Sequence, residues 1–214
     1  MKRGNSLKEV FPFLGGLCLV TDRRLCGLTC EEMTKIALES GVGWIQYREK
    51  EKTRREIYHE AMRLRVLTAE YGARLVVNDH VDVALAVDAD GVHLGQDDLP
   101  LKEARRILGD RIMGISTHSL TQAVEAEHDG ADYIGFGPVF FTTTKDAGEP
   151  KGLKMLSIIK RAVKIPVVAI GGISAENLPL VLEAGADAVA VASAMLRGDI
   201  SVNVRSFTRI LSDE

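Results

Sequence analysis

The chain has 214 residues, of which 46% are hydrophobic and 27% charged, a balance typical of a globular domain with a large core. Its formal net charge of −3 excludes the broad positive field that draws a protein to nucleic acid or to an anionic membrane, so an anionic ligand must be bound by local groups. No apolar run is long enough to span a bilayer. The cysteines, Cys18, Cys26 and Cys30, lack a second Cys/His pair and are expected to be reduced thiols of a cytoplasmic protein.

Short β-rich runs alternate with helical runs along the chain. The predicted strands are residues 17–21, 44–48, 74–78, 91–94, 112–116, 133–136, 167–170 and 188–191. The predicted helices are residues 29–40, 53–71, 81–87, a helix that begins near Pro100, and residues 120–128, 153–163, 175–183 and 202–211. Thr29 is the expected N-cap of the first helix.

Eight strands that alternate with eight helices predict an α/β protein with one (β/α)8 TIM barrel. The single domain is expected to span residues 1–214, with residues 1–15 as an extension before the first strand. A doubly wound open sheet shares the alternation, but no G-x-G-x-x-G motif follows the first strand. Gly130-Ala131-Asp132 and Gly185-Ala186-Asp187, with Ala89-Asp90-Gly91 as a looser relative, indicate a repeated helix-to-strand turn.

The second predicted strand ends in a cationic sequence. Alternate side chains of a strand share a face, so Gln46, Arg48 and Lys50 are expected to point the same way. Two neighbouring cations repel each other unless an anion lies between them, and arginine and lysine are both phosphate ligands. This pattern predicts an anion site; the alternative is a charged strand end that emerges into water.

Carboxylates follow the third and fourth predicted strands. Asp79 comes directly after strand three, and Asp97 and Asp98 come after strand four. Because neighbouring strand ends lie about 5 Å apart in a parallel sheet, these carboxylates can reach one centre. Oxygen ligands beside phosphate-binding cations predict a Mg²⁺ site. The alternatives are a helix N-cap for Asp79 and a solvated turn for Asp97 and Asp98.

Strands five and six lead into polar segments. Ser116 is a candidate hydrogen-bond donor at the barrel mouth, whereas His118 and His93 are expected to be packing residues. The loop of residues 137–152 is long for a βα connection and predicts a lid, with a tolerated surface insertion as the alternative.

Small residues follow strands seven and eight. Gly171-Gly172 and Ala192-Ser193 leave backbone N–H groups accessible to an anion. Loops after strands seven and eight are the common phosphate site of such barrels, so a second anion site is expected there.

The chain contains a combination of specific motifs, which are Gln46-x-Arg48-x-Lys50, Asn78-Asp79, Gly91-Val92-His93-Leu94-Gly95-Gln96-x-Asp98, Thr142-x-Thr144-Lys145 and Gly171-Gly172-Ile173. In these motifs, and from residue 17 to residue 194, the chain resembles the thiamine-phosphate synthase family. In that family a pyrimidine diphosphate is joined to a thiazole phosphate by a dissociative, Mg²⁺-dependent reaction that releases pyrophosphate. Cys18 departs from the resemblance, because many relatives carry an aromatic residue there.

The resemblance implies a role for each matching position. The expected contacts of the pyrimidine diphosphate are Gln46, Arg48, Lys50, Asn78, Ser116 and Lys145. The expected contacts of the thiazole phosphate are Thr142, Thr144, Gly172, Ala192 and Ser193. Asp79 and Asp98 are expected to bind Mg²⁺, and Arg48, Lys50 and Lys145 to be the catalytic cations that neutralise the departing diphosphate.

Two other functions are open to such a chain. A thiazole tautomerase would keep the second anion site and use His118 as acid and base, but it would not need Asp79, Asp98, Arg48 and Lys145 together. A non-catalytic phosphate sensor would not need the metal carboxylates. The sequence leaves a homodimer open.

Overall fold

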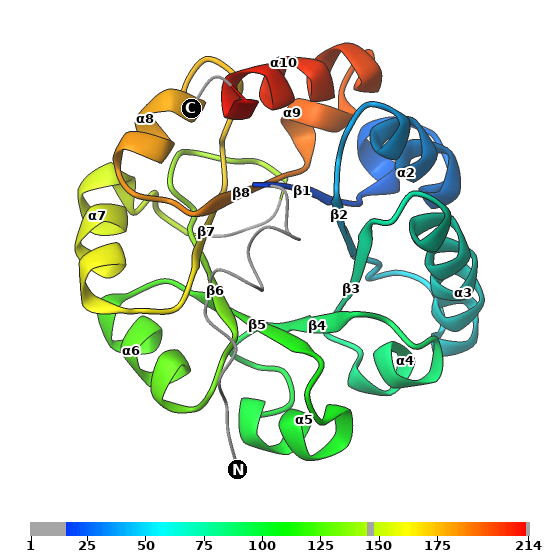
Figure 1. The fold of residues 1–214 in the computed structure, drawn as a ribbon, viewed down its shortest axis with the longest axis horizontal. Coiled ribbons are helices and arrows are strands. Elements are labelled where there is room, and N and C mark those ends of the chain that lie inside the picture. Colours follow the sequence, from blue (N-terminus) through cyan, green and yellow to red (C-terminus); the bar gives the residue numbers. More distant parts are fainter. Residues whose placement is uncertain (1–15, 145–147, 213–214) are drawn as a thin grey trace.

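The computed structural model describes residues 16–144 and 148–212, and in these ranges eight parallel strands close into a barrel in the order β1 to β8 (Figure 1). The strands are β1 (Leu17–Val20), β2 (Trp44–Tyr47), β3 (Arg74–Asn78), β4 (Gly91–Leu94), β5 (Ile112–Thr117), β6 (Tyr133–Phe136), β7 (Val167–Ile170) and β8 (Ala188–Val191). The predicted (β/α)8 barrel is therefore confirmed. The extension predicted at residues 1–15 lies outside the described residues.

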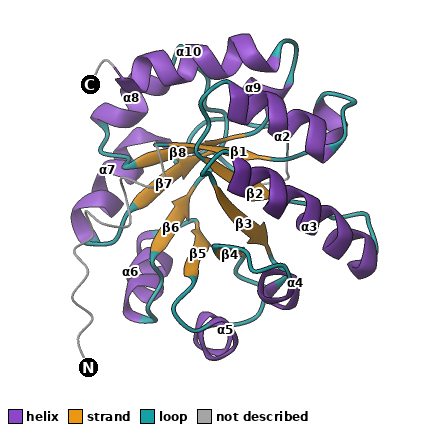
Figure 2. Cartoon of the chain, turned by 45° about the vertical axis from the view of Figure 1, so that its right-hand side comes forward, coloured by secondary structure: helices purple, strands orange, loops and turns teal. Residues whose placement is uncertain are grey.

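Helices cover the outside of the barrel (Figure 2). They are η1 (Arg23–Leu25), α2 (Cys30–Glu39), α3 (Arg54–Glu70), α4 (Val81–Ala86), α5 (Leu101–Leu108), α6 (Leu120–His128), α7 (Gly152–Ala162), α8 (Leu178–Glu183), α9 (Ser193–Leu196) and α10 (Ile200–Ser212). The last helix, α10, packs beside α2, so the outer ring closes as the barrel does (Figure 1). None of the helices in the described ranges has the length and apolar character needed to cross a bilayer.

Several element ends differ from the prediction. Strand β2 ends at Tyr47, so Arg48 lies just beyond it, and β5 continues to Thr117. Helix α8 begins at Leu178 rather than at residue 175, because the Asn177 side chain accepts the Ser174 N–H and holds these residues in a turn. Thr29 is the N-cap of α2, as predicted, and forms a capping box with Glu32.

The strands separate two layers of side chains. One cluster, on the inward face of the barrel, contains Cys18, Val20, Trp44, Val76, Tyr133, Val168, Ala188 and Ala190. The other, larger cluster lies between the strands and the helices. Cys18 is fully buried in the first cluster, and burial raises the pKa of its thiol well above the ordinary value, so it is an unreactive packing residue. Cys18, Cys26 and Cys30 are all free thiols.

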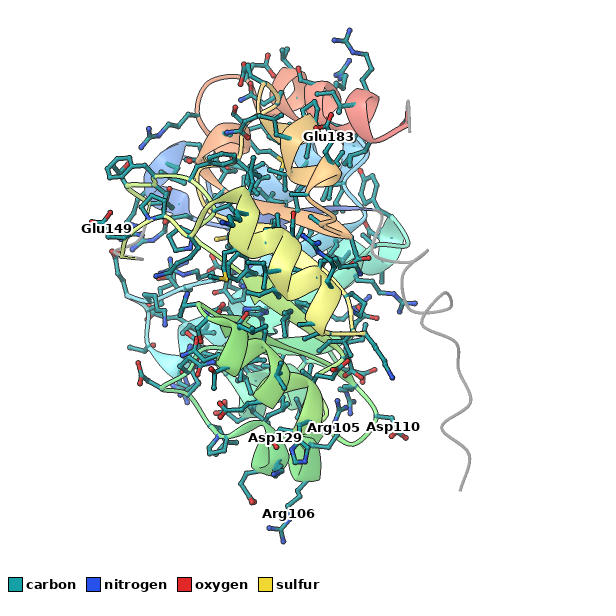
Figure 3. All side chains as sticks on the ribbon, turned by 90° about the vertical axis from the view of Figure 1, so that its left-hand side faces the viewer. Arg105, Arg106, Asp110, Asp129, Glu149 and Glu183 are labelled. Carbon is teal, nitrogen blue, oxygen red and sulfur yellow. The ribbon has the colours of Figure 1, made fainter. Side chains whose placement is uncertain are left out.

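An aspartate recurs in the turn before β4, β6 and β8. The carboxylates of Asp90, Asp132 and Asp187 accept the backbone N–H groups of Leu75, Met113 and Val167 at 2.8–2.9 Å. Each carboxylate also pairs with basic side chains, which are Arg65 and Arg74, Arg105, and Lys160 respectively. In Figure 3, Arg105 lies on one side of the barrel, and Glu149, in the β6–α7 loop, projects on the opposite side. The predicted repeated turn is thus an ion-paired anchor at the amino ends of the strands.

Candidate active site

A cavity of about 130 Å³ opens at the carboxyl ends of the strands. Residues in the last part of β1, β5, β6, β7 and β8, or just after these strands and β2, line it, so the barrel closure itself brings distant parts of the sequence together. The predicted site residues in its lining are Arg48, Ser116, Thr142, Thr144, Gly172, Ala192 and Ser193.

Mostly small residues form the side of the cavity made by β7 and β8. Gly172 has a φ of 66°, and a Cβ there would lie 2.7 Å from the Cβ of Phe140, so a side chain has no room. Ala192 is the N-cap of the short helix α9, which begins at Ser193. The sequence did not predict α9, although a short extra helix after β8 is a recurrent part of barrel phosphate sites. Mostly small residues of the two loops after β7 and β8 therefore line one side of the cavity.

Ser116 belongs to a hydrogen-bonded chain inside the barrel. His93 lies 2.9 Å from the Ser116 hydroxyl through Nε2 and 2.9 Å from the Tyr133 hydroxyl through Nδ1. Gly135 makes space for the imidazole, because a Cβ there would lie 2.9 Å from His93 Cε1. His93 is buried, as expected of a packing residue, but the prediction missed its contact with Ser116. This contact orients the hydroxyl at the cavity wall.

Asp22, at the end of β1, is a site residue that the sequence analysis missed. Its carboxylate accepts two hydrogen bonds from the Arg24 guanidinium, at 2.8 and 2.6 Å, and one from the Arg24 backbone N–H at 3.2 Å, and it lies 3.8 Å from the Arg48 guanidinium. The hydrogen bond from Arg24, aided by the Arg48 charge, lowers the pKa of Asp22 despite burial. The carboxylate is thus ionised and helps to hold Arg48 at the cavity wall.

The remaining predicted residues form a second group at the ends of β2, β3 and β4. The Gln46 side chain donates to Asn78 at 2.8 Å inside the barrel, and the Lys50 ammonium donates to Asp79. A small hollow is lined by Arg48 and Lys50, among others, and it shares Arg48 and Asp22 with the lining of the cavity. The cations predicted for one substrate are therefore neighbours in space.

Asp79 and Asp98 are in direct contact. Burial raises the pKa of Asp98, and the adjacent Asp79 raises it further, although the carboxylate accepts the Gly95 N–H at 2.6 Å. Burial also raises the pKa of Asp79, but the Lys50 hydrogen bond and the bond with Asp98 outweigh it and lower the pKa. Asp79 adopts a φ of 64°, which is unusual for a residue other than glycine and places its side chain toward Lys50.

The alternatives for these carboxylates can now be decided. The N-cap of α4 is His80, so the helix-cap alternative for Asp79 is wrong. Asp97 is exposed in a turn, whereas Asp98 faces Asp79. Asp97 thus fits the solvated-turn interpretation, whereas the half-buried Asp98 contacts Asp79; the role of Asp98 as a metal ligand stays a prediction.

The loop after β6 is described only in part. Thr142 and Thr144 line the cavity, and the Thr142 hydroxyl accepts the Thr144 N–H at 3.3 Å. Lys145 lies outside the described residues, so its predicted role and the predicted lid stay predictions.

Comparisons with known proteins agree with this geometry. The model of the family described as thiamine monophosphate synthase matches residues 17–195. The chain belongs to this family. It is 50% identical to the thiamine-phosphate synthase of Chloroflexus aurantiacus over 185 residues, or 86% of each chain. It is 47% identical to that of Caldicellulosiruptor saccharolyticus over 92% of this chain and 95% of the relative. The thiamine phosphate pyrophosphorylase structure from Pyrococcus furiosus superposes with a TM-score of 0.88 at 44% identity, covering 94% of this chain and 97% of the other.

Membership of the thiamine monophosphate synthase family assigns the chain a thiamine-phosphate synthase activity, which is that of a transferase in thiamine biosynthesis. Its substrates are small molecules, in agreement with the size of the cavity. The predicted site residues divide into two groups. Cationic and acidic residues lie at the ends of β2–β4, and small residues lie after β7 and β8.

Proposed function

We propose that this site joins an aminopyrimidine methyl diphosphate to a thiazole phosphate and releases pyrophosphate. The observation that carries the proposal is the separation of two groups of residues suited to anions around one barrel mouth. Cations and carboxylates gather after β2–β4, and loops of mostly small residues, which let an anion approach backbone amides, line the cavity after β7 and β8. A reaction between two anionic substrates, of which only one loses its diphosphate, requires such a division.

We further propose Mg²⁺ as the cofactor, held by Asp79 and Asp98. The two carboxylates are in contact, and the pKa of Asp98 is raised by burial and then by Asp79; a divalent cation between them would relieve the repulsion of the two ionised groups. In the part of the chain that the structure describes, no group of three or more His, Cys, Asp or Glu side chains is arranged for a metal. Two carboxylates suffice for Mg²⁺, since water and phosphate oxygens complete its coordination. When bound, the ion would supply positive charge for the diphosphate.

The chain's own residues account for the rest of the chemistry. Arg48 and Lys50 stabilise the negative charge that grows on the departing diphosphate, and Ser116 contributes a hydroxyl donor at the cavity wall. Gln46 and Asn78, joined by their hydrogen bond, present amide groups to the pyrimidine. The loops with Gly172 and Ser193 hold the thiazole phosphate within reach of the methylene carbon that loses the diphosphate. A dissociative reaction of this kind uses no protein nucleophile.

The test is an assay with both substrates that detects pyrophosphate, with Mg²⁺ and after its removal by a chelator. We expect pyrophosphate release only when both substrates and Mg²⁺ are present. Isomerisation of a thiazole phosphate without pyrophosphate release would instead identify a tautomerase, and binding without turnover would identify a sensor.

A further inference from the structure

We propose that Glu60, in the middle of α3, is a positioning residue for the reaction because it fixes the segment that carries Arg48 and Lys50. This inference rests on the proposed function, in which those two cations bind the diphosphate. Glu60 itself lies behind β2, on the helical side of the barrel, and it lines neither the cavity nor the neighbouring hollow.

Glu60 joins the two ends of the cationic segment. Its carboxylate accepts the Tyr47 hydroxyl at 2.5 Å and the Lys52 ammonium at 2.6 Å. Tyr47 is the last residue of β2, and Lys52 follows Lys50 by two positions. One carboxylate therefore holds the residues on either side of Arg48 and Lys50.

The middle of the segment is held in the same way. Glu49 accepts the backbone N–H groups of Lys50 and Glu51, both at 2.7 Å, and its other oxygen lies 3.4 Å from Arg23 and 4.0 Å from Lys52. Side chains at positions 47 and 49 thus anchor the segment, while those at 46, 48 and 50 reach the site. The alternation predicted for this stretch continues beyond the last residue of β2.

Stability alone gives little reason for this arrangement. Glu60 is only 3% exposed, and removing a carboxylate from water costs free energy that apolar packing between a strand and a helix does not. Directional contacts from a carboxylate restrict the positions of Tyr47 and Lys52 far more tightly than apolar contacts would. A misplacement of about 1 Å in a catalytic group can cost about 10²-fold in rate, so tight restriction of Arg48 and Lys50 has a functional value.

Glu60→Gln tests the proposal with nearly unchanged volume. The substituted amide would be uncharged, and loss of a negative charge favours an anionic substrate by Coulomb's law, so a charge effect alone would lower the KM for the pyrimidine diphosphate. Loss of positioning predicts the opposite, a higher KM for the pyrimidine diphosphate. We expect kcat/KM for the pyrimidine diphosphate to fall about 10-fold, with the KM for the thiazole phosphate unchanged within about twofold.

Two further variants separate positioning from general loss of stability. Asp90→Asn removes a partly buried, ion-paired carboxylate at the amino ends of the strands and should lower the thermal midpoint while leaving both KM values unchanged. Tyr47→Phe removes one hydrogen bond to Glu60 without changing any charge, and it should produce a weaker form of the Glu60→Gln effect even if Glu60→Gln fails to fold. Glu60→Asp should recover part of the loss.

Arg48→Ala distinguishes failure of this inference from failure of the proposed function. If Arg48→Ala is impaired while Glu60→Gln and Tyr47→Phe both keep wild-type kinetics, the positioning role is wrong and the proposed site stands. An equal rise of both KM values in Glu60→Gln, matched by Asp90→Asn, would also overturn it. If Arg48→Ala keeps full activity, the proposed diphosphate site itself is wrong.

Discussion

The ammonium of Lys50 donates to the carboxylate of Asp79, so a cation proposed for the diphosphate and a carboxylate proposed for Mg²⁺ neutralise each other across the ends of β2 and β3. To bind, Mg²⁺ must therefore displace Lys50 from Asp79, and the diphosphate must displace Asp79 from Lys50. Mg²⁺ bound to Asp79 would release Lys50 for the diphosphate, and diphosphate bound to Lys50 would free Asp79 for the metal. The two ligands should bind cooperatively.

Lys50→Ala tests this exchange. In the wild-type protein, pyrophosphate should tighten Mg²⁺ binding by about tenfold, the scale of a coupling of about 1.4 kcal/mol. In Lys50→Ala, Mg²⁺ alone should bind more tightly than to the wild type, and the effect of pyrophosphate should shrink. Calorimetric titration of Mg²⁺ with and without pyrophosphate measures both. Equal Mg²⁺ affinity in the two proteins would show that the Lys50 contact does not compete with the metal.

Asp79→Asn should abolish turnover at ordinary Mg²⁺ concentrations while the fold is kept. The variant loses a metal ligand. It also loses the contact with Asp98, a carboxyl whose pKa is raised by burial and by this contact, and the ion pair with Lys50, which lowers the pKa of Asp79. These two losses act on stability in opposite directions, so we expect a thermal midpoint close to that of the wild type. Pyrophosphate release and a melting curve are the measurements. Asp97→Asn is the control, because Asp97 is exposed and should tolerate the change in both assays.

Gly172→Ala should weaken binding of the thiazole phosphate. A Cβ at this position would meet Phe140 and the backbone oxygen of Phe141, so the substitution displaces the β6–α7 loop as well as strains its own backbone. We expect a rise in the KM for the thiazole phosphate and a loss of about 1–3 kcal/mol in stability. Gly109→Ala has a similar φ, 61°, but no atom near the new Cβ, and should lose stability without the change in KM. Equal rises of both substrates' KM values in Gly172→Ala would mean that the two anion regions are not separate.

The ion-paired turn at Asp90 should make stability depend on pH. Burial raises the pKa of Asp90, but the Leu75 N–H and the guanidinium groups of Arg74 and Arg65 outweigh burial and lower it. A lowered folded-state pKa means that the stabilisation is complete above the unfolded value of about 3.9 and is lost as pH falls through the folded value. The difference in unfolding free energy between the wild type and Asp90→Asn should therefore narrow as the pH falls from about 5 toward 2. Urea titrations across this range measure it, and a constant difference would contradict the assignment.

The fold was predictable because each strand and helix has its own local signal. Alternating strand-like and helical runs, Thr29 as an N-cap and the Gly-Ala-Asp turns all depend on residues close in sequence. Helix α9 was missed because four residues are too few to show a helical period. The turn before α8 was predicted as helix. The contact that makes it a turn is a single hydrogen bond from the Ser174 N–H to the Asn177 side chain, and the sequence pattern does not show such a bond.

The lining of the cavity was predictable only where residues lie at or just after the end of a strand. That rule found Arg48, Ser116 and Gly172, and it would have found Asp22, which directly follows the predicted end of strand one. The same rule predicted that Asp79 and Asp98 lie close together, and they are in contact. Glu60 had no such signal, because in sequence it resembles any solvated glutamate of a helix. Only the packing of α3 against β2 shows that it is buried and which groups it contacts.

Lys145 and His118 should differ in how much each contributes to the rate of condensation. The Thr144 next to Lys145 lines the cavity, and a lysine there is expected to act on the departing diphosphate, where charge grows in the transition state. Loss of one such donor typically costs about 10²-fold in rate, so Lys145→Ala should slow condensation by about that factor and leave thiazole phosphate affinity nearly unchanged. His118 also lines the cavity, but its Nδ1 lies 2.6 Å from the Gly137 carbonyl oxygen, which only accepts, so Nδ1 carries a proton and orients the ring. Because the synthase reaction gives His118 no proton to move, His118→Ala should have a much smaller effect in single-turnover measurements of pyrophosphate release. The opposite ranking, with His118 essential and Lys145 dispensable, would favour a tautomerase.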